Sequence, residues 1–159
     1  KYITDKTPLN FKWIGFIKNF LPDAKIIICN RNLDDVFVSI FKNNFTSNEM
    51  KWAFDEENIG KFIALYKDLI NFYFNLYEKD LYKINYENLI NNTEVEIKNM
   101  LKFCDLEWEK NCLEPHKNFT SSISTASIYQ ARKPIYKSSI NTSNIYNKYL
   151  NKYFKLNIN

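Results

Sequence analysis

Glycine is nearly absent from this chain of 159 residues, which contains 2 glycines and 4 prolines. Folds built from many short strands need turn residues at every connection, so this scarcity argues against an all-β architecture and favours long helices. The chain also lacks any apolar run approaching the length of a transmembrane helix, about 18 residues. We therefore expect no membrane span, and with no visible signal peptide we expect a cytoplasmic protein.

Cysteine and histidine are also scarce, with 3 cysteines and 1 histidine in the chain. Cys29, Cys104 and Cys112 have no metal-ligand spacing, and their odd number argues against a disulfide framework. We expect no bound metal and a reducing compartment. Cys29 falls in an apolar run and is expected to be a small buried side chain. His116 is expected to be a surface or capping residue.

Charge of one sign is not concentrated anywhere, because the net charge is only +4 and acidic residues are mixed among the lysines. This balance suits an anionic small-molecule ligand, or no charged ligand at all, better than nucleic acid. RNA binding through "YNKYLNKYFK" is the alternative, but Lys and Tyr recur there as on a solvated helix with an apolar seam. The 45% hydrophobic and 17% aromatic content predicts one folded domain over residues 1–159.

Hydrophobic periodicity predicts strands that alternate with helices, which is typical of an α/β fold with a parallel sheet. The expected strands are 24–30 and 82–86. The expected helices start near Pro8, at about Leu33, after Asp55, at a Thr93/Glu96 capping box and at Ser143. Two strands do not make a stable covered sheet. The chain also begins at Lys1 without Met, so we expect an upstream part of the domain to be missing.

The stretch "IIICNRNLDDVFVSIF", residues 26–41, places a charged side chain directly after an apolar strand. Asn32 fits the N-cap of the next helix, and Asp34 and Asp35 favour the positive end of its dipole. Arg31 is then expected at the carboxyl end of a parallel strand, where ligands bind in open α/β sheets. Ser39 shares the Asp35 face, so a guanidinium and a hydroxyl are available to one phosphate. An Arg31 that merely closes the strand and pairs with Asp34 or Asp35 is the structural alternative.

Four segments follow one another along the chain: "ITDKTPLNF", "RNLDDVFVS", "YKINYENLI" and "TASIYQARKPIYKSS". From Ile3 to about Ser139 they resemble the sulfotransferases that use 3′-phosphoadenylyl sulfate (PAPS), in particular the bacterial branch related to tyrosylprotein sulfotransferases. The resemblance implies a fold similar to P-loop kinases, here helix-rich and N-terminally incomplete. It implies transfer of a sulfuryl group from PAPS to a hydroxyl or amine, with adenosine 3′,5′-bisphosphate as product and no metal. The acceptor, whether peptide, carbohydrate or small molecule, is not readable.

The resemblance also implies roles for individual residues. Arg31 and Ser39 hold the 3′-phosphate, and Tyr86 lies near the nucleotide. Residues 127–136 correspond to a loop that folds over the nucleotide. Lys6 corresponds to the lysine that neutralises the sulfuryl oxygens, as a loose transition state requires, and Ser127 to the serine that assists it. The predicted cofactor-binding residues are Arg31, Ser39, Tyr86, Gln130, Arg132, Lys133, Pro134 and Lys137.

The chain departs from the family pattern in three places. The loop that binds the 5′-phosphosulfate, and the usual general base, would precede Lys1. Leu33 replaces a proline often found two residues after the Arg, which helix initiation tolerates. "SSINTSN" replaces the Gly-Arg-Trp that closes the cofactor loop, and Lys137 substitutes for that Arg only in part. Whether this chain alone is active stays open.

Other functions compete with sulfuryl transfer. The missing loop and base leave a non-catalytic nucleotide-binding or interaction module as the main alternative. A nucleotide kinase of the same broad fold is a weaker one, because no G-x-x-x-x-G-K-[ST] loop is present. Single residues also have ordinary explanations: Lys6 as a solvated neighbour of a helix cap, Ser127 as a loop serine, and Tyr86 as a side chain that packs with Phe72 or Tyr73.

Overall fold

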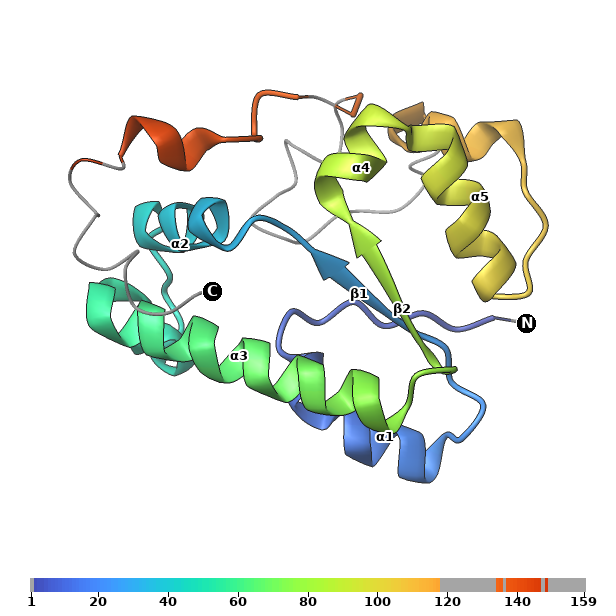
Figure 1. Ribbon diagram of the computed structural model, residues 1–159, viewed down its shortest axis with the longest axis horizontal. Coiled ribbons are helices and arrows are strands. Elements are labelled where there is room, and N and C mark those ends of the chain that lie inside the picture. The colour runs from blue at the N-terminus through green and yellow to red at the C-terminus, as the bar shows by residue number, and fades with distance from the viewer. Residues whose placement is uncertain (1, 118–133, 136, 147, 149–159) are drawn as a thin grey trace.

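A two-stranded parallel sheet lies at the centre of the computed structural model, with helices around it (Figure 1). The structure describes residues 2–117, 134–135, 137–146 and 148. Strand β1 (Ile26–Asn30) pairs with β2 (Leu81–Asn85), so that Ile26 lies opposite Leu81 and Asn30 opposite Asn85. The predicted α/β class with a parallel sheet is confirmed, and both strands lie within two residues of their predicted starts.

The helices follow the predicted order along the described part of the chain. The long α-helices α2 and α3 connect the two strands, and α4 begins directly after β2. The elements beside the strands are η1 (Asn10–Trp13), α1 (Ile14–Phe20), α2 (Leu33–Lys42), η2 (Asn48–Phe54), α3 (Glu56–Leu76), α4 (Tyr86–Asn91), α5 (Thr93–Phe103), η3 (Lys110–Leu113), η4 (Pro115–Lys117) and η5 (Thr142–Ile145). No helix in these described stretches is long and apolar enough to cross a membrane.

One predicted helix cap is confirmed, one is wrong, and a third cap was not predicted. The Asn32 side chain accepts a hydrogen bond from the Asp35 amide and caps α2, as predicted. Asp55 caps α3 by accepting from the Asn58 amide at 2.8 Å. The capping box at Thr93 is wrong, because Thr93 is already helical and Asn92 occupies the N-cap position without a side-chain cap. The predicted helix is present, but its N-cap lies one residue earlier than the capping box predicts.

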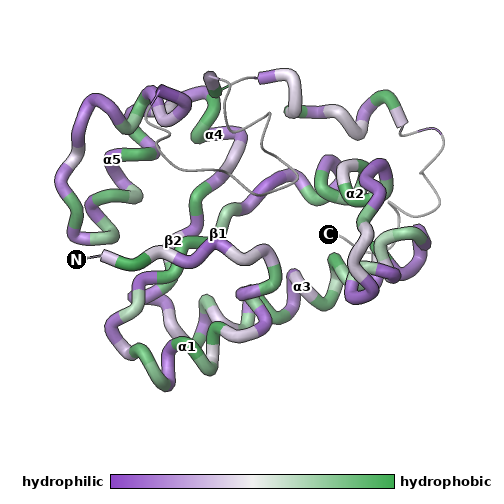
Figure 2. Tube along the Cα trace, turned by 180° about the vertical axis from the view of Figure 1, so that it is seen from behind, coloured by the Kyte–Doolittle hydropathy of each residue, from purple (hydrophilic) through white to green (hydrophobic). Residues whose placement is uncertain are grey.

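Two apolar clusters hold the helices to the sheet and to each other. The first joins α2 to α3 and contains Phe37, Val38, Ile59 and Ile63. The second lies where α1 and α3 meet the strands and contains Ile14, Ile28, Ile70 and Leu81. Figure 2 shows α1 and α3 side by side, with apolar positions recurring along both helices. Gly15 permits this close approach, since an added Cβ would lie 3.3 Å from the Tyr73 hydroxyl oxygen.

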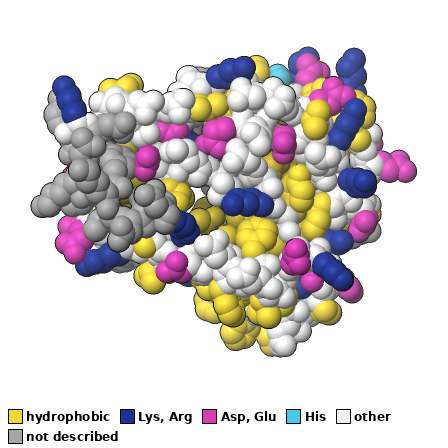
Figure 3. Space-filling view, in the orientation of Figure 1, with side chains coloured by type: hydrophobic (Ala, Val, Ile, Leu, Met, Phe, Trp, Pro, Cys, Tyr) yellow, Lys and Arg dark blue, Asp and Glu magenta, His cyan; other side chains and the backbone are white. Residues whose placement is uncertain are grey.

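Several apolar residues lie outside these clusters, contrary to expectation. Cys29 is exposed, not buried, so the described residues do not cover its face of β1. Phe16 and Phe20, which we counted toward the apolar side of the first helix, are also exposed, and Ile14 is its buried contact. The apolar surface over α1 is visible at the lower edge of Figure 3. The final predicted helix, from Ser143 to Leu156, lies mostly outside the described residues; Thr142–Ile145 form a 3₁₀ turn.

Candidate functional site

The carboxyl ends of β1 and β2 bring Arg31 and Tyr86 to one edge of the sheet. Because Asn30 lies opposite Asn85 in a parallel pair, the residues that follow them leave the strands side by side. The Arg31 guanidinium carbon lies 5.0 Å from the centre of the Tyr86 ring. This cation–π contact fixes the plane in which the guanidinium can turn. It takes the place of the packing with Phe72 or Tyr73 that was the alternative for Tyr86, since those two rings contact each other.

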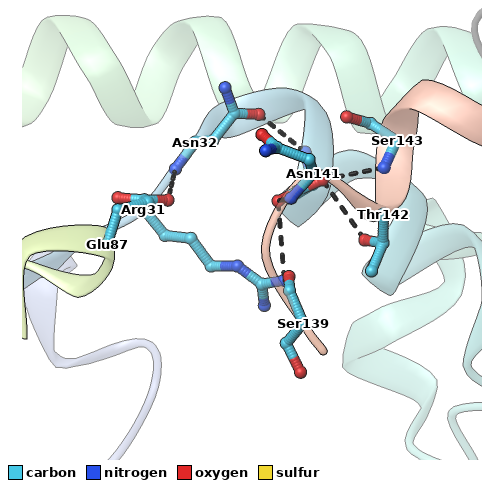
Figure 4. Close-up of polar contacts among 8 residues, drawn as sticks. Arg31, Asn32, Glu87, Ser139, Asn141, Thr142 and Ser143 are labelled. Atoms are coloured by element: carbon cyan, nitrogen blue, oxygen red, sulfur yellow. Dashed lines mark hydrogen bonds and ion pairs between the residues drawn. The ribbon is translucent and has the colours of Figure 1, made fainter. Parts of the chain in front are cut away.

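Two asparagines shape the backbone at this edge. Asn32 caps α2, and Asn85 caps α4 by accepting from the amides of Glu87 and Asn88. The Glu87 carboxylate accepts a hydrogen bond of 2.9 Å from the Asn32 amide, which ties the start of α2 to the start of α4 (Figure 4). The residues around Arg31 are therefore held by capping interactions within both βα junctions.

Arg31 is only partly satisfied by the groups around it. Its side chain is 23% exposed, and its Nη2 donates to the Ser139 carbonyl oxygen at 2.5 Å. The same nitrogen lies 3.9 Å from an Asp35 oxygen, so the predicted structural pairing with Asp35 is present, at the outer limit for an ion pair. Its Nε is buried and has no hydrogen-bond partner in the described part of the chain. A buried donor without a partner is uncommon in folded proteins, and here it leaves the guanidinium able to bind a further acceptor.

Asp35 is completely buried, with 0% of its surface exposed. Its carboxylate accepts from the Asn141 amide at 2.8 Å, the Ser143 amide at 2.8 Å and the Thr142 hydroxyl at 3.2 Å. Burial raises the pKa of this carboxyl, but the hydrogen bonds from Ser143, Asn141 and Thr142 outweigh it, so that the pKa lies below its ordinary value. Asp35 is therefore an ionised carboxylate that holds a distant segment of the chain.

Ser39 lies one helical turn beyond Asp35 and is half-buried. Its carbonyl oxygen accepts from the Asn43 side chain at 2.7 Å. The hydrogen bonds of the Arg31 guanidinium go to Ser139 and not to the Ser39 hydroxyl. The two predicted phosphate ligands thus share an end of the fold, but no direct contact joins them in the structure.

Lys6 is exposed and lies close enough to Cys29 to affect its titration. Partial desolvation raises the pKa of the Cys29 thiol, and the positive charge of Lys6 opposes this rise. Since Cys29 precedes Arg31 by two residues, the fold brings the N-terminal "DKTP" segment toward the same end of β1. Lys6 thus lies near β1, and its catalytic role stays a prediction.

The remaining predicted site residues belong to the later part of the chain. Pro134 and Lys137 are exposed. Lys137 begins a turn closed by a hydrogen bond from the Ile140 amide to the Lys137 carbonyl, 3.1 Å long. This turn leads directly into the residues that Asp35 holds. The other predictions on this segment, Ser127, Gln130, Arg132 and Lys133, lie outside the described residues.

Sequence reasoning missed the partners that complete this site. Ser139, Asn141, Thr142 and Ser143 were interpreted as a departure from the family pattern, whereas they supply the groups that contact Arg31 and Asp35. Glu87 was not singled out either. None of these residues has a local signal, because each contact joins segments remote in sequence. The described stretches contain no group of acidic, His or Cys residues that could hold a metal ion.

Comparison with known proteins identifies the family of this chain. A family model described as "Sulfotransferase family" matches residues 1–110, which include Lys6, Arg31, Ser39 and Tyr86. An uncharacterized protein of Aquifex aeolicus (strain VF5) is 37% identical over 150 residues, covering 93% of this chain and 20% of that protein. The chain thus spans about a fifth of the length of the curated relative it matches. From the family match, the chain belongs to the sulfotransferase family.

Proposed function

We propose that this protein transfers a sulfuryl group from PAPS to a hydroxyl or amine acceptor, releasing adenosine 3′,5′-bisphosphate. Family membership supports the reaction class. The observation that carries the assignment to this site is Arg31, a guanidinium at the carboxyl end of a parallel strand whose buried Nε has no hydrogen-bond partner among the described residues. A P-loop-kinase-like arrangement and a cytoplasmic location are parts of the same proposal.

Arg31 and its neighbours fit a phosphate group. A guanidinium binds phosphate through two parallel N–H donors, and Nε with one Nη forms such a pair. Tyr86 supports the opposite side of the guanidinium at 5.0 Å. The first turn of α2, a helix of 10 residues, adds the positive end of its dipole. We therefore assign the 3′-phosphate to Arg31, with Ser39 as a second ligand.

Lys6 is the residue we assign to the moving sulfuryl group. In the reaction a bond forms between the acceptor atom and sulfur while the bond from sulfur to the 5′-phosphate oxygen breaks, and the acceptor proton passes to a base. Fixed positive charge near the sulfuryl oxygens lowers the energy of such a loose transition state without any change in protonation. Ser127 is proposed to assist Lys6, and Gln130, Arg132, Lys133, Pro134 and Lys137 to contact the nucleotide.

Turnover of labelled PAPS by the full-length gene product tests the proposal. Lys6→Ala should lower kcat about 100-fold, the usual cost of removing one group that stabilises transition-state charge, with little change in nucleotide affinity. Lys98→Ala is the matched control, since Lys98 pairs with Glu94 on the surface of α5 and has no assigned role. Equal turnover in the two variants would contradict the role of Lys6.

A non-catalytic nucleotide-binding module is the second candidate. One observation favours it: an Nη of Arg31 already donates to the Ser139 carbonyl, and no residue assigned above is a general base. Binding of adenosine 3′,5′-bisphosphate without turnover of PAPS, over a panel of peptide, carbohydrate and phenolic acceptors, would favour this candidate over the enzyme.

A further inference from the structure

The segment Ser139–Tyr146 is held against α2 by contacts at both ends of that helix. At the N-terminal end, Asp35 accepts hydrogen bonds from the Asn141 and Ser143 amides and from the Thr142 hydroxyl. At the other end, Tyr146 packs on the α2–α3 cluster and its ring lies 4.7 Å from the Lys42 ammonium. Figure 1 shows the segment lying alongside α2, from which it is separated by about 100 positions in the sequence.

The local backbone of this segment is shaped to receive a carboxylate. Asn141 has a left-handed conformation, with φ 58°, which Asn tolerates better than most residues. In this conformation the amides of Asn141 and Ser143 both point to Asp35, one to each carboxylate oxygen. Figure 4 shows Asn141, Thr142 and Ser143 on the side of the segment that faces the start of α2.

A completely buried carboxylate is costly to maintain unless charged or polar groups satisfy it. If Asp35 served only to start α2, an exposed acidic residue in the first turn would favour the helix dipole at no such cost. The carboxylate instead accepts hydrogen bonds from residues 106 to 108 positions later. The hydrogen bonds to that segment therefore offset the cost of burying the Asp35 carboxylate.

The held segment also touches the proposed phosphate ligand. The Ser139 carbonyl accepts from the Arg31 Nη2, and Arg31 lies one helical turn before Asp35. On the upstream side, the turn from Lys137 to Ile140 connects the anchored residues to an exposed lysine. The position of the segment thus sets both the orientation of the guanidinium and the location of a second cation.

We propose that Asp35 is a positioning residue for nucleotide binding, which anchors residues 139–143 so that Arg31 and Lys137 approach the same phosphate-bearing ligand from two elements. This inference rests on the proposed function, because it takes Arg31 as a ligand of the nucleotide. Asp35 itself contacts no ligand. By linkage, whatever releases the segment weakens nucleotide binding, and bound nucleotide protects the segment from release.

The test is a double-variant cycle on the full-length gene product, with calorimetry of adenosine 3′,5′-bisphosphate binding. Asp35→Asn keeps the shape of the side chain but removes the charge and one acceptor oxygen. If the anchored state falls to about a tenth of the population, the apparent affinity falls about tenfold. Lys137→Ala as a single variant should weaken binding. Added to Asp35→Asn it should have no further effect, because the lysine is then no longer held near the nucleotide. Asp55→Ala removes the carboxylate that caps α3. This variant is the control for lost stability and should bind the nucleotide like the wild type.

Hydrogen exchange separates positioning from a merely structural role. In Asp35→Asn the amides of Asn141 and Ser143 should exchange faster while those of α3 stay protected, and adenosine 3′,5′-bisphosphate should slow exchange of the same two amides in the wild type. Wild-type affinity in Asp35→Asn, with those amides exchanging fast, would overturn the inference and leave the function standing. Unchanged protection of these amides in Asp35→Asn would overturn it as well.

Two further outcomes are distinguishable. Failure of the wild type to bind adenosine 3′,5′-bisphosphate would overturn the proposed function and with it this inference. Should Asp35→Asn not fold, Thr142→Val takes its place in the cycle, since it removes one hydrogen bond of 3.2 Å to the carboxylate and keeps the side-chain volume. A loss of affinity of about threefold is then expected, and none would overturn the inference.

Discussion

A buried charged residue lies near each end of β1, and the two residues differ in the hydrogen-bond partners that they have. At the amino ends of the strands, Lys18 is 7% exposed, donates to the Pro22 and Ala24 carbonyls and pairs with Asp80 at 3.1 Å. All its partners lie in the loops that lead into β1 and β2. At the carboxyl ends, Asp35 binds a segment more than 100 positions later, and Arg31 keeps a buried donor without a partner in the described part of the chain.

We interpret this difference as one between a structural charge and a charge that is available to a ligand. Lys18 has an acceptor for each of its N–H donors and nothing left to offer a ligand. The Arg31–Asp35 end has a carboxylate that is fully satisfied and a guanidinium that is not. The comparison therefore places the proposed ligand site at the carboxyl ends of the strands, and it can be sharpened or broken by changing one charge at a time.

The largest effect is expected for stability when Asp35 is removed. Asp35→Ala leaves the buried Ser143 amide, the Asn141 amide and the Thr142 hydroxyl without this acceptor, so the free energy of unfolding should fall by about 3 kcal/mol. Lys18→Met should cost less, about 1 kcal/mol, because Asp80 is 40% exposed and can be solvated by water. Denaturant unfolding measures both. A larger loss for Lys18→Met than for Asp35→Ala would reverse the ranking of the two ends.

The next effect is a dependence of stability on pH. A carboxyl whose pKa is lowered in the folded state stabilises the fold above its unfolded pKa, and this stabilisation is lost as the pH falls through the folded pKa. The ordinary value is 3.8, so the advantage of the wild type over Asp35→Asn should be full at neutral pH and should decline below about pH 4.

Asp34 must be controlled in that measurement. Burial and the neighbouring Asp35 carboxylate raise the pKa of Asp34, so its contribution to stability has the opposite sign: it favours the fold at low pH. Making the comparison in an Asp34→Asn background removes this opposing effect. If the stability difference between that background and the same background with Asp35→Asn added does not change from pH 7 to about pH 2, an ionised, hydrogen-bonded Asp35 is contradicted.

The smallest effect concerns the ring beneath the guanidinium. Tyr86→Leu removes the cation–π contact with Arg31 and should weaken binding of adenosine 3′,5′-bisphosphate by about 1 kcal/mol. Tyr86→Phe keeps the ring and should bind within about a factor of two of the wild type. Calorimetry distinguishes them, and equal losses in both variants would assign the role to the hydroxyl group instead of the ring.

Most of the fold could be predicted from local patterns. The β1 strand, the Asn32 cap and the start of α3 all depend on residues within one turn of each other, where propensity and capping act directly. The placement of Arg31 beside Tyr86 also follows, because parallel strands end at one edge of a sheet.

What could not be predicted depends on contacts remote in sequence. Asp35 looked like an ordinary acidic residue in the first turn of a helix, and only the position of residues 141–143 shows its role. The exposure of Cys29 likewise depends on which elements cover that face of β1, which no local pattern reveals. The Thr93 capping box failed by one residue, the usual scale of error at helix ends.

The central claim, that Arg31 binds the 3′-phosphate, is tested most directly by comparing two ligands in calorimetry. Adenosine 3′,5′-bisphosphate carries that phosphate and adenosine 5′-monophosphate lacks it. Arg31→Ala should weaken binding of the first ligand about 30-fold, the loss of about 2 kcal/mol for a charge-assisted contact, and leave the second within about a factor of two. Arg31→Lys should fall between, since a lysine keeps the charge without the two-pronged donor. Equal losses for both ligands, or none for either, would contradict the claim.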